Sequence, residues 1–198
     1  MPPPDLDGTD AASAYARSLL VGELVRLREL RSADLLQLDR WWADPGLQIF
    51  QTTRVDAGVE GSTESMFRAW SANDNLGTAA FSIERLADAS LVGHVSLWGA
   101  DPKNRDAKLG ILLGTEFLGE RLGSDAVRVV VRYAFVEMGL HRVTLQVYAF
   151  NTRAVAAYRR VGFVEEGRAR RAVWHAGRWY DEVSMGIVAD EWSDTSDG

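Results

Sequence analysis

The stretch from Leu109 to Met138 constrains the fold more than any other part of the chain. An apolar run is followed by a loop with glycines at positions 114, 119 and 123, and then by a helical pattern of apolar residues. We therefore expect a strand at 107–113 and a helix from about 125 to 138, with Gly139 as its C-cap. Unpaired N–H groups and the helix dipole favour an anion at such a loop. A tight turn that merely starts the helix explains the same residues equally well.

The remaining patterns predict a mixed α/β (α+β) domain with a mixed sheet and helices packed on it. Ser32 is placed to cap the first helix and Asn151 the last, which Gly162 ends. Short connections make the strands between 78 and 113 antiparallel neighbours. The predicted strands are 24–30, 78–86, 91–98, 107–113, 141–150, 163–173 and 179–187, and the helices are 32–42, 62–72, 125–138 and 151–161.

Charge is distributed unevenly along the chain. The net charge of −6 disfavours nucleic acid as a partner, but residues 1–22 sum to −2 and residues 189–198 to −4, so the tails carry all of it. Residues 142–178 hold eight arginines against two glutamates. We expect flexible tails at 1–21 and 193–198 around one domain at 22–192, whose arginine-rich half suits a polyanionic ligand.

Several classes are disfavoured by composition. The chain has no cysteine, so a disulfide scaffold, a thiolate metal site and a cysteine nucleophile are excluded. The apolar runs of the chain are far shorter than the ~20 residues of a membrane helix, so we expect no membrane partner. The sequence does not open with a charged segment followed by an apolar one, so we expect a cytoplasmic protein. The three histidines lack metal-ligand spacing, and we expect no metal.

A second motif makes the pattern specific. Asn151 opens the run Asn-Thr-Arg-Ala-Val-Ala-Ala-Tyr-Arg-Arg-Val-Gly-Phe, and alone its Asn reads as a helix cap and its Tyr as a core aromatic. Together with the upstream loop, this run resembles the GNAT superfamily of N-acetyltransferases, in particular its ribosomal-protein (Rim-type) branch. The likeness also includes Gly-Leu-His-Arg-Val at 139–143, Glu-Gly at 166–167 and Gly-Arg-Trp-Tyr-Asp at 177–181. Weaker likeness extends over 23–192.

The resemblance implies a GNAT-like fold, with a central, mostly antiparallel twisted sheet of about seven strands and about four helices. It also implies transfer of an acetyl group from acetyl-CoA to a primary amine in a ternary complex. Tyr158 aligns with the tyrosine that protonates the departing thiolate, which a nearby phenol of pKa ~10 can do. The residues implied to bind acetyl-CoA are Ile111, Leu112, Leu113, Gly119, Glu120, Arg121, Leu122, Gly123, Ser124, Asn151, Arg153, Ala154, Ala157, Tyr158 and Arg160.

The sequence departs from the family pattern at several positions. Arg121 replaces the middle glycine of the loop, Leu118 an Arg or Gln, and Ala154 a serine. Lys108 stands where relatives often carry a Glu that serves as the general base. As proton acceptor we consider Glu116 first, with Glu84 or a water chain as alternatives.

A missing base favours an acceptor that loses its proton easily. At pH 7 about one lysine amine in 2,500 is neutral, but about one α-amine in ten. We therefore expect a weakly basic acceptor such as a protein or peptide α-amine. Lys108 could also bind a carboxylate of the substrate or of a dicarboxylic acyl donor, although a surface lysine explains it more simply.

Two other functions remain open at this point. One is an acyl-CoA-binding regulatory domain with little turnover, and the other is acetylation of a small amine or antibiotic. Because dimers are common in the Rim-type branch, a homodimer is an expectation too. At least one of Trp41, Trp42 and Trp70 should line the acceptor groove. His175 could face the substrate, but a place at the surface is the simpler expectation.

Overall fold

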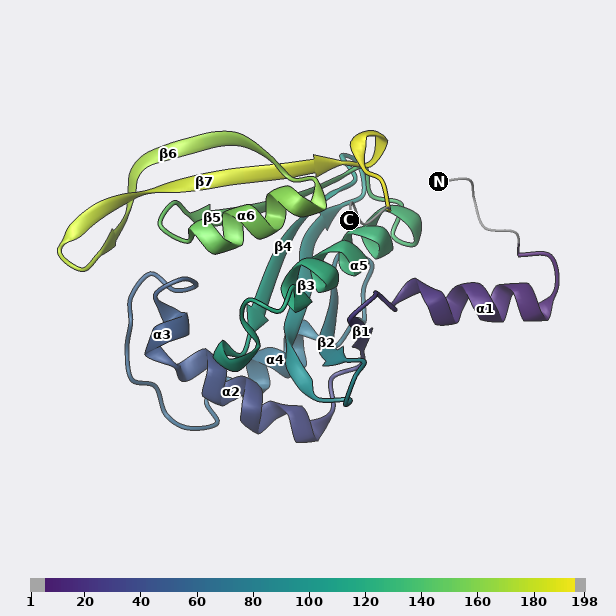
Figure 1. The fold of residues 1–198 in the computed structure, drawn as a ribbon, viewed down its shortest axis with the longest axis horizontal. Helices are drawn as coiled ribbons and strands as arrows, with labels where there is room; N and C mark the ends of the chain where they lie inside the picture. Colours follow the sequence, from purple (N-terminus) through teal and green to yellow (C-terminus); the bar gives the residue numbers. More distant parts are fainter. Residues whose placement is uncertain (1–5, 195–198) are drawn as a thin grey trace.

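One seven-stranded sheet forms the centre of the molecule (Figure 1). The computed structural model describes residues 6–194, and its strands lie in the order β1-β2-β3-β4-β5-β7-β6. All neighbours are antiparallel except β4 and β5, which are parallel, so the predicted mixed sheet is confirmed. The strands are β1 (Val25–Arg28), β2 (Ala79–Arg85), β3 (Leu91–Asp101), β4 (Asp106–Leu113), β5 (Arg142–Tyr148), β6 (Val164–His175) and β7 (Arg178–Val188).

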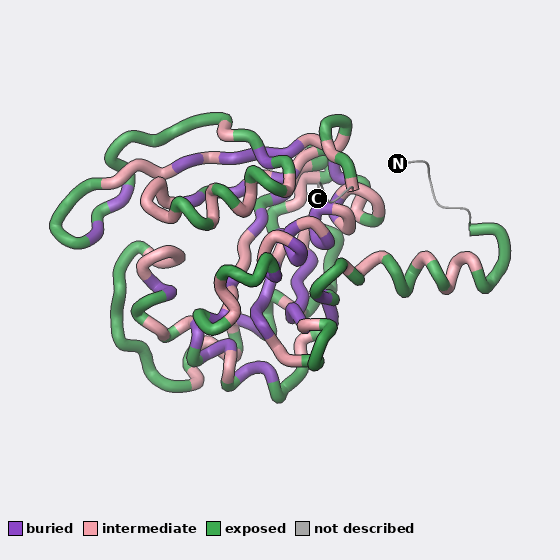
Figure 2. Tube along the Cα trace, viewed as in Figure 1, coloured by how far each residue is buried: buried purple, intermediate pink, exposed green. Residues whose placement is uncertain are grey.

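Helices pack against both faces of this sheet. Buried apolar residues of α5 (Leu122–Val136) join the main core together with β1–β5 and β7, and α6 (Thr152–Val161) packs against the same core. On the other face, α2 (Leu35–Ala43) and α4 (Glu64–Trp70) form a smaller core around Leu112 of β4. Figure 2 shows the burial concentrated in the central strands and α5.

The helices differ from prediction in three places. Within residues 6–194 there are six α-helices rather than about four, because α1 (Thr9–Leu19) and α3 (Pro45–Gln48) also form. Asp44 ends α2 as predicted, but its carboxylate accepts from Gly46 N at 2.7 Å and starts α3 at once. Ser32 does not cap α2; it lies in a 3-10 turn (Ser32–Asp34), where the Asp34 side chain accepts from Arg31 N at 2.9 Å.

The predicted N-terminal tail contains α1, which is anchored to α5. The guanidinium of Arg132 donates to Leu19 O at 2.9 Å, and the Tyr15 hydroxyl donates to Glu137 at 3.0 Å. The alanine-rich sequence of α1 favours a helix despite its lack of a buried residue. The tail predictions for residues 1–5 and 195–198 lie outside the described residues.

Two elements extend from the body at opposite ends (Figure 1). One is α1, and the other is the β6–β7 hairpin, most of whose β6 residues are exposed. His175, at the end of β6, is buried rather than at the surface, because rings of Tyr148 and Phe150 pack against it. No helix within residues 6–194 has the length and apolar character needed to cross a membrane.

Candidate active site

The parallel strands β4 and β5 part shortly after they meet. Their pairing consists of Asp106 with Arg142, Ala107 with Val143 and Lys108 with Thr144. Beyond these pairs β4 runs on to Leu113 and β5 to Tyr148 without a ladder between them. The centre of the sheet therefore contains a wedge-shaped gap that opens from Lys108.

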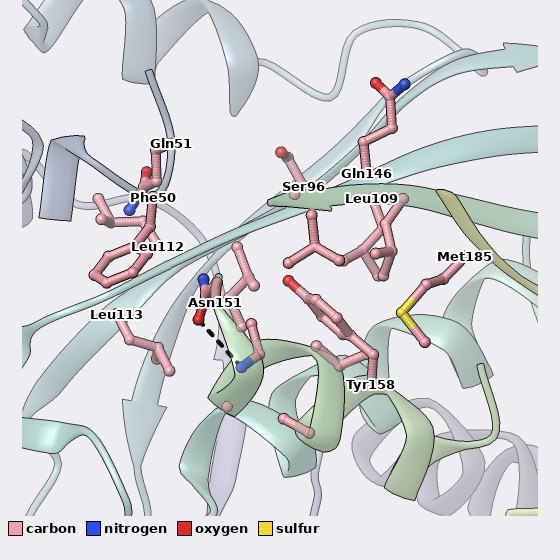
Figure 3. A pocket seen from close by; sticks show the side chains of 18 of the residues that line it. Phe50, Gln51, Ser96, Leu109, Leu112, Leu113, Gln146, Asn151, Tyr158 and Met185 are labelled. Carbon is pink, nitrogen blue, oxygen red and sulfur yellow. Dashed lines mark hydrogen bonds between the residues drawn. The ribbon is translucent and has the colours of Figure 1, made fainter. Parts of the chain in front are cut away.

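A cavity of about 1030 Å³ occupies this gap and reaches both faces of the sheet. Successive residues of a strand point to opposite faces. Leu109 and Ile111 pack with the core under α5 and α6, whereas Leu112 packs with α2 and α4, and all three line the cavity. In Figure 3, Ser96 and Gln146 lie across β4 from Tyr158 and Asn151. Groups bound on the two faces can therefore meet through the sheet.

The loop before α5 brings a helix N-terminus to one end of the cavity. Gly119 (φ 94°) and Arg121 (φ 63°) both adopt left-handed backbone conformations, and Arg121 is the N-cap of the helix. Gly123 and Ser124, in the first turn of this 15-residue helix, line the cavity. N–H groups of a first turn lack partners within the helix, and together with the helix dipole they favour an anion.

Asp125 fixes this helix end against the sheet. Its buried carboxylate accepts from the backbone N–H groups of Glu23, Leu24 and Val25 at 3.2, 2.7 and 3.0 Å. It also pairs with Arg128 at 2.5 Å. The start of α5 is thereby held to the strand that begins the domain, which positions the loop rigidly.

The opposite wall is supplied by α6. Its N-cap Asn151 accepts from Ala154 N at 3.2 Å, and Gly162 ends the helix in a left-handed conformation (φ 108°), both as predicted. Tyr158 is partly buried, and its hydroxyl points from α6 toward β4 (Figure 3). Burial raises the pKa of Tyr158 to about 12, so its phenol keeps its proton at neutral pH.

This geometry agrees with a known family. A family model described as an acetyltransferase (GNAT) domain matches residues 25–164. The chain belongs to this GNAT family. The match spans the sheet from β1 to the start of β6, including the β4–β5 gap, the loop before α5 and helix α6.

Individual GNAT relatives differ in what their names say they acetylate. A 107-residue stretch is 36% identical to the putative ribosomal N-acetyltransferase YdaF of Bacillus subtilis, covering 54% of this chain and 58% of that protein. Another of 111 residues is 29% identical to spermidine N(1)-acetyltransferase of Vibrio cholerae, covering 56% and 64% respectively. The chain thus spans less than two thirds of the length of these relatives.

A solved GNAT structure shares the whole architecture. It is spermidine N-acetyltransferase from Vibrio cholerae in complex with CoA and spermine, which superposes with a TM-score of 0.74. The superposition covers 84% of this chain and 96% of that one at 23% identity. At this identity the likeness shows the common fold.

Most of the residues predicted to bind acetyl-CoA line the one cavity. Two do not: Glu120 pairs with Arg85 at 3.2 Å, and Leu122 is buried in the core. The predicted residues that line the cavity are Ile111, Leu112, Leu113, Gly119, Arg121, Gly123, Ser124, Asn151, Arg153, Ala154, Ala157, Tyr158 and Arg160.

The two glutamates considered as bases do not line this GNAT cavity. The Glu116 carboxylate accepts from the indole Nε1 of Trp41 at 3.2 Å, and Trp41 packs so tightly on Gly114 that a Cβ there would lie 2.4 Å from the ring. The structure therefore does not bring Glu116 to Tyr158.

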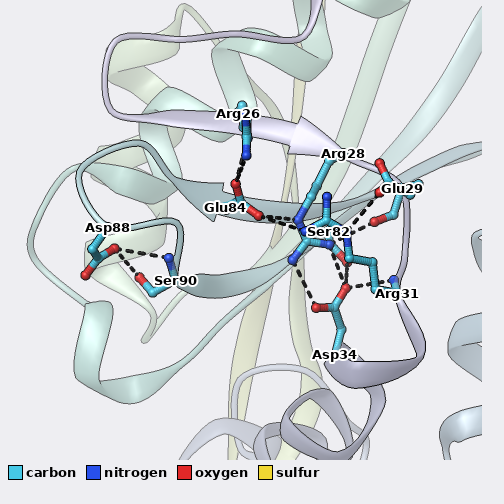
Figure 4. Close-up of polar contacts among 9 residues, drawn as sticks. All are labelled: Arg26, Arg28, Glu29, Arg31, Asp34, Ser82, Glu84, Asp88 and Ser90. Atoms are coloured by element: carbon cyan, nitrogen blue, oxygen red, sulfur yellow. Dashed lines mark hydrogen bonds and ion pairs between the residues drawn. The ribbon is translucent and has the colours of Figure 1, made fainter.

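Glu84 belongs instead to a buried ion-pair network between β1 and β2 (Figure 4). It accepts from Arg28 Nε at 2.5 Å and from Arg26 Nε at 2.6 Å, while Arg28 also forms a bidentate pair with Asp34 at 2.7 and 3.0 Å. Burial acts to raise the pKa of Glu84, but the two arginines outweigh it and hold the pKa below its usual value. A carboxylate paired in this way is structural.

The sequence did not predict several residues that line the cavity. Trp42 and Trp70 line the cavity as expected of at least one tryptophan, but so do Phe50, Phe67 and the buried His94. The His94 ring packs against Phe67, and its Nε2 lies 2.8 Å from Ser71 Oγ. Burial lowers the pKa of His94 to about 4, so its imidazole is neutral at pH 7.

Proposed function

We propose that this chain transfers the acetyl group of acetyl-CoA to a primary amine, and that its preferred acceptor is a weakly basic amine such as a peptide α-amine. The observation that carries the proposal is the single cavity that passes through the sheet. It joins an anion-binding helix end on one face to an aromatic and polar wall on the other, so that two substrates can meet directly.

The residues present fit the cofactor's chemistry. The first turn of α5 provides N–H groups for a pyrophosphate, and Arg121, Arg153 and Arg160 line the same cavity, where guanidinium groups suit phosphates. The unpaired edge of β4 beyond Lys108 offers backbone groups to an extended arm with amide groups. Acetyl-CoA would supply an activated thioester to this chain.

In the proposed reaction the neutral amine forms a C–N bond with the acetyl carbon, the C–S bond breaks and the thiolate receives a proton. The nitrogen, which is cationic after the attack, loses a proton to water. Tyr158 is suited to protonate the thiolate, because its phenol stays protonated at neutral pH and points into the cavity. Lys108, at the position of the family's frequent Glu, cannot act as a carboxylate base. An acceptor that is already partly neutral at pH 7 removes the need for one.

The test is a CoA-release assay with acetyl-CoA and a panel of peptide α-amines, lysine side-chain amines and spermidine. We expect α-amines to react fastest and Tyr158→Phe to lower kcat at least tenfold while leaving the acetyl-CoA Kd unchanged. Tyr133→Phe is the matched control, because Tyr133 packs on Phe81 outside the cavity. Acetyl-CoA binding without turnover of any amine would instead indicate a binding domain.

A further inference from the structure

The face of the sheet opposite α6 carries its own set of cavity residues. By strand alternation, Ser96 of β3, Gln146 of β5 and Ser184 of β7 point to this face, and all three line the cavity. Tyr148 and Glu182, which are paired across β5 and β7, lie on the same face one step further along. We call the cavity residues on this side of the sheet the acceptor face. The sequence motif around Asn151 includes none of these positions.

Glu182 differs from the other carboxylate of the cavity in having no partner. Glu166 is held by an ion pair with Arg142. Among residues 6–194, by contrast, no side chain forms an ion pair or hydrogen bond with the half-buried Glu182 carboxylate. Burial and the charge of Glu182 both raise the pKa of Tyr148, its partner across β5 and β7. A partly desolvated, unpartnered carboxylate in a cavity favours a cationic ligand.

Tyr148, the strand partner of Glu182, belongs to an aromatic cluster. Phe150 packs between Phe50, Tyr148 and Tyr180, with ring centroids 5.8, 5.5 and 4.7 Å away. The Tyr148 hydroxyl donates to Thr52 O at 3.2 Å, which fastens this cluster to the segment after α3. Aromatic rings beside a carboxylate accommodate both an ammonium group and an apolar body.

The remaining charges of the cavity oppose a polycation. Lys108 lies on the acceptor face beside Trp98, and it forms no ion pair within the described chain. Arg121, Arg153 and Arg160 line the cofactor side. With Glu166 already neutralised, one free carboxylate is available against these cations, which is too little to hold the several ammonium groups of a polyamine.

We propose that Glu182 binds the weakly basic acceptor as an ammonium ion when it enters the cavity, before its nitrogen loses a proton to water and attacks the thioester. The acceptor face then selects a monoamine with an apolar or aromatic body over a polyamine. This inference rests on the proposed function, since it names the class of amine that the same cavity receives. It also assigns Glu182 a role in acceptor specificity that the family motifs do not carry.

The first test compares kcat/KM for phenylalanine amide, tyrosine amide and spermidine. We expect both aromatic monoamines to exceed spermidine at least tenfold. Glu182→Gln should raise KM for phenylalanine amide about tenfold or more, the usual effect of losing a charged hydrogen bond, and leave KM for acetyl-CoA within twofold. Glu182→Asp should recover part of the loss, and the exposed Glu60→Gln is the control. A preference for spermidine, or an unchanged KM in Glu182→Gln, would overturn the inference.

A second measurement separates this inference from the proposed function. Titration of phenylalanine amide into the CoA-bound protein by calorimetry needs no turnover, and we expect its Kd to rise at least tenfold in Glu182→Gln. If binding depends on Glu182 but no amine is acetylated, the proposed function fails and this inference stands. If amines are acetylated but neither KM nor Kd depends on Glu182, this inference fails alone.

Discussion

Arg121 should affect stability and cofactor affinity in opposite directions. Its backbone is left-handed (φ 63°), a conformation that costs a non-glycine residue roughly 1–2 kcal/mol. Replacing it by glycine removes this cost but adds about 0.5–1 kcal/mol of unfolded-chain entropy. The net expectation for Arg121→Gly is a gain of about 0.5–1 kcal/mol in the free energy of unfolding, which for a domain of this size corresponds to roughly 2–4 °C in Tm per kcal/mol.

The same change removes a guanidinium from the cavity. Because Arg121 is exposed, solvent screens its charge, and we expect the loss of acetyl-CoA affinity to be about tenfold, the lower end for a charged hydrogen bond. Arg121→Ala is the matched variant, since it removes the charge but keeps the strained backbone. Urea unfolding and calorimetric titration with acetyl-CoA measure the two effects.

The expected pattern is specific to this geometry. Both variants should bind acetyl-CoA more weakly, but only the glycine variant should be more stable than the natural chain. Lower stability of Arg121→Gly would refute the assignment of strain to the loop. Unchanged affinity in Arg121→Ala would refute the contact between this side chain and the cofactor.

Two further predictions concern stability. Asp125→Ala should lower the free energy of unfolding by about 3 kcal/mol or more, because three backbone N–H groups lose their buried acceptor. Urea unfolding checks this, with the exposed Asp74→Ala as the control. Equal losses of stability in the two variants would contradict the prediction. His94 has a folded pKa of about 4 against an unfolded value of 6.5, so the unfolded chain binds its proton first as the pH falls. The free energy of unfolding should therefore decrease by up to about 3 kcal/mol from pH 6.5 toward pH 4, and by less in His94→Gln. The lowered pKa of Glu84 reduces stability only below about pH 4.5, so it does not account for this decrease. An identical slope in both chains would rule out His94 as the source.

Local patterns predicted the parts of the fold that local interactions decide. Asn151 and Gly162 bound α6 as expected, because a side-chain cap and a left-handed C-cap need only neighbouring residues. Helix α5 begins earlier than its apolar stripe suggests, since the left-handed turn at Arg121 fixes its first residue. Helix α1 has no buried residue and therefore no apolar pattern to reveal it, and its anchor, Arg132, lies more than a hundred residues away in sequence.

The proposed acceptor face could not be predicted for the same reason. Glu182 meets Tyr148 only because β7 pairs with β5 across the intervening helix and strand. Glu116 stands in the predicted loop, but its orientation depends on Trp41 from a distant helix. A family motif records contacts near the cofactor, whereas the proposed acceptor face gathers residues from the four strands β3, β4, β5 and β7.

The parting of β4 and β5 also bears on how the molecule avoids aggregation. Past Lys108, β4 has a free strand edge in the middle of the sheet, with backbone groups that no ladder uses. An open edge of this kind on the outside of a protein recruits strands from other chains. Here the edge faces β5, the neighbouring strand of the same sheet, across a gap that α6 also lines, so it does not lie on the outside of the protein. The protein can therefore keep unpaired donors and acceptors for a ligand's extended arm without offering them to a neighbouring molecule.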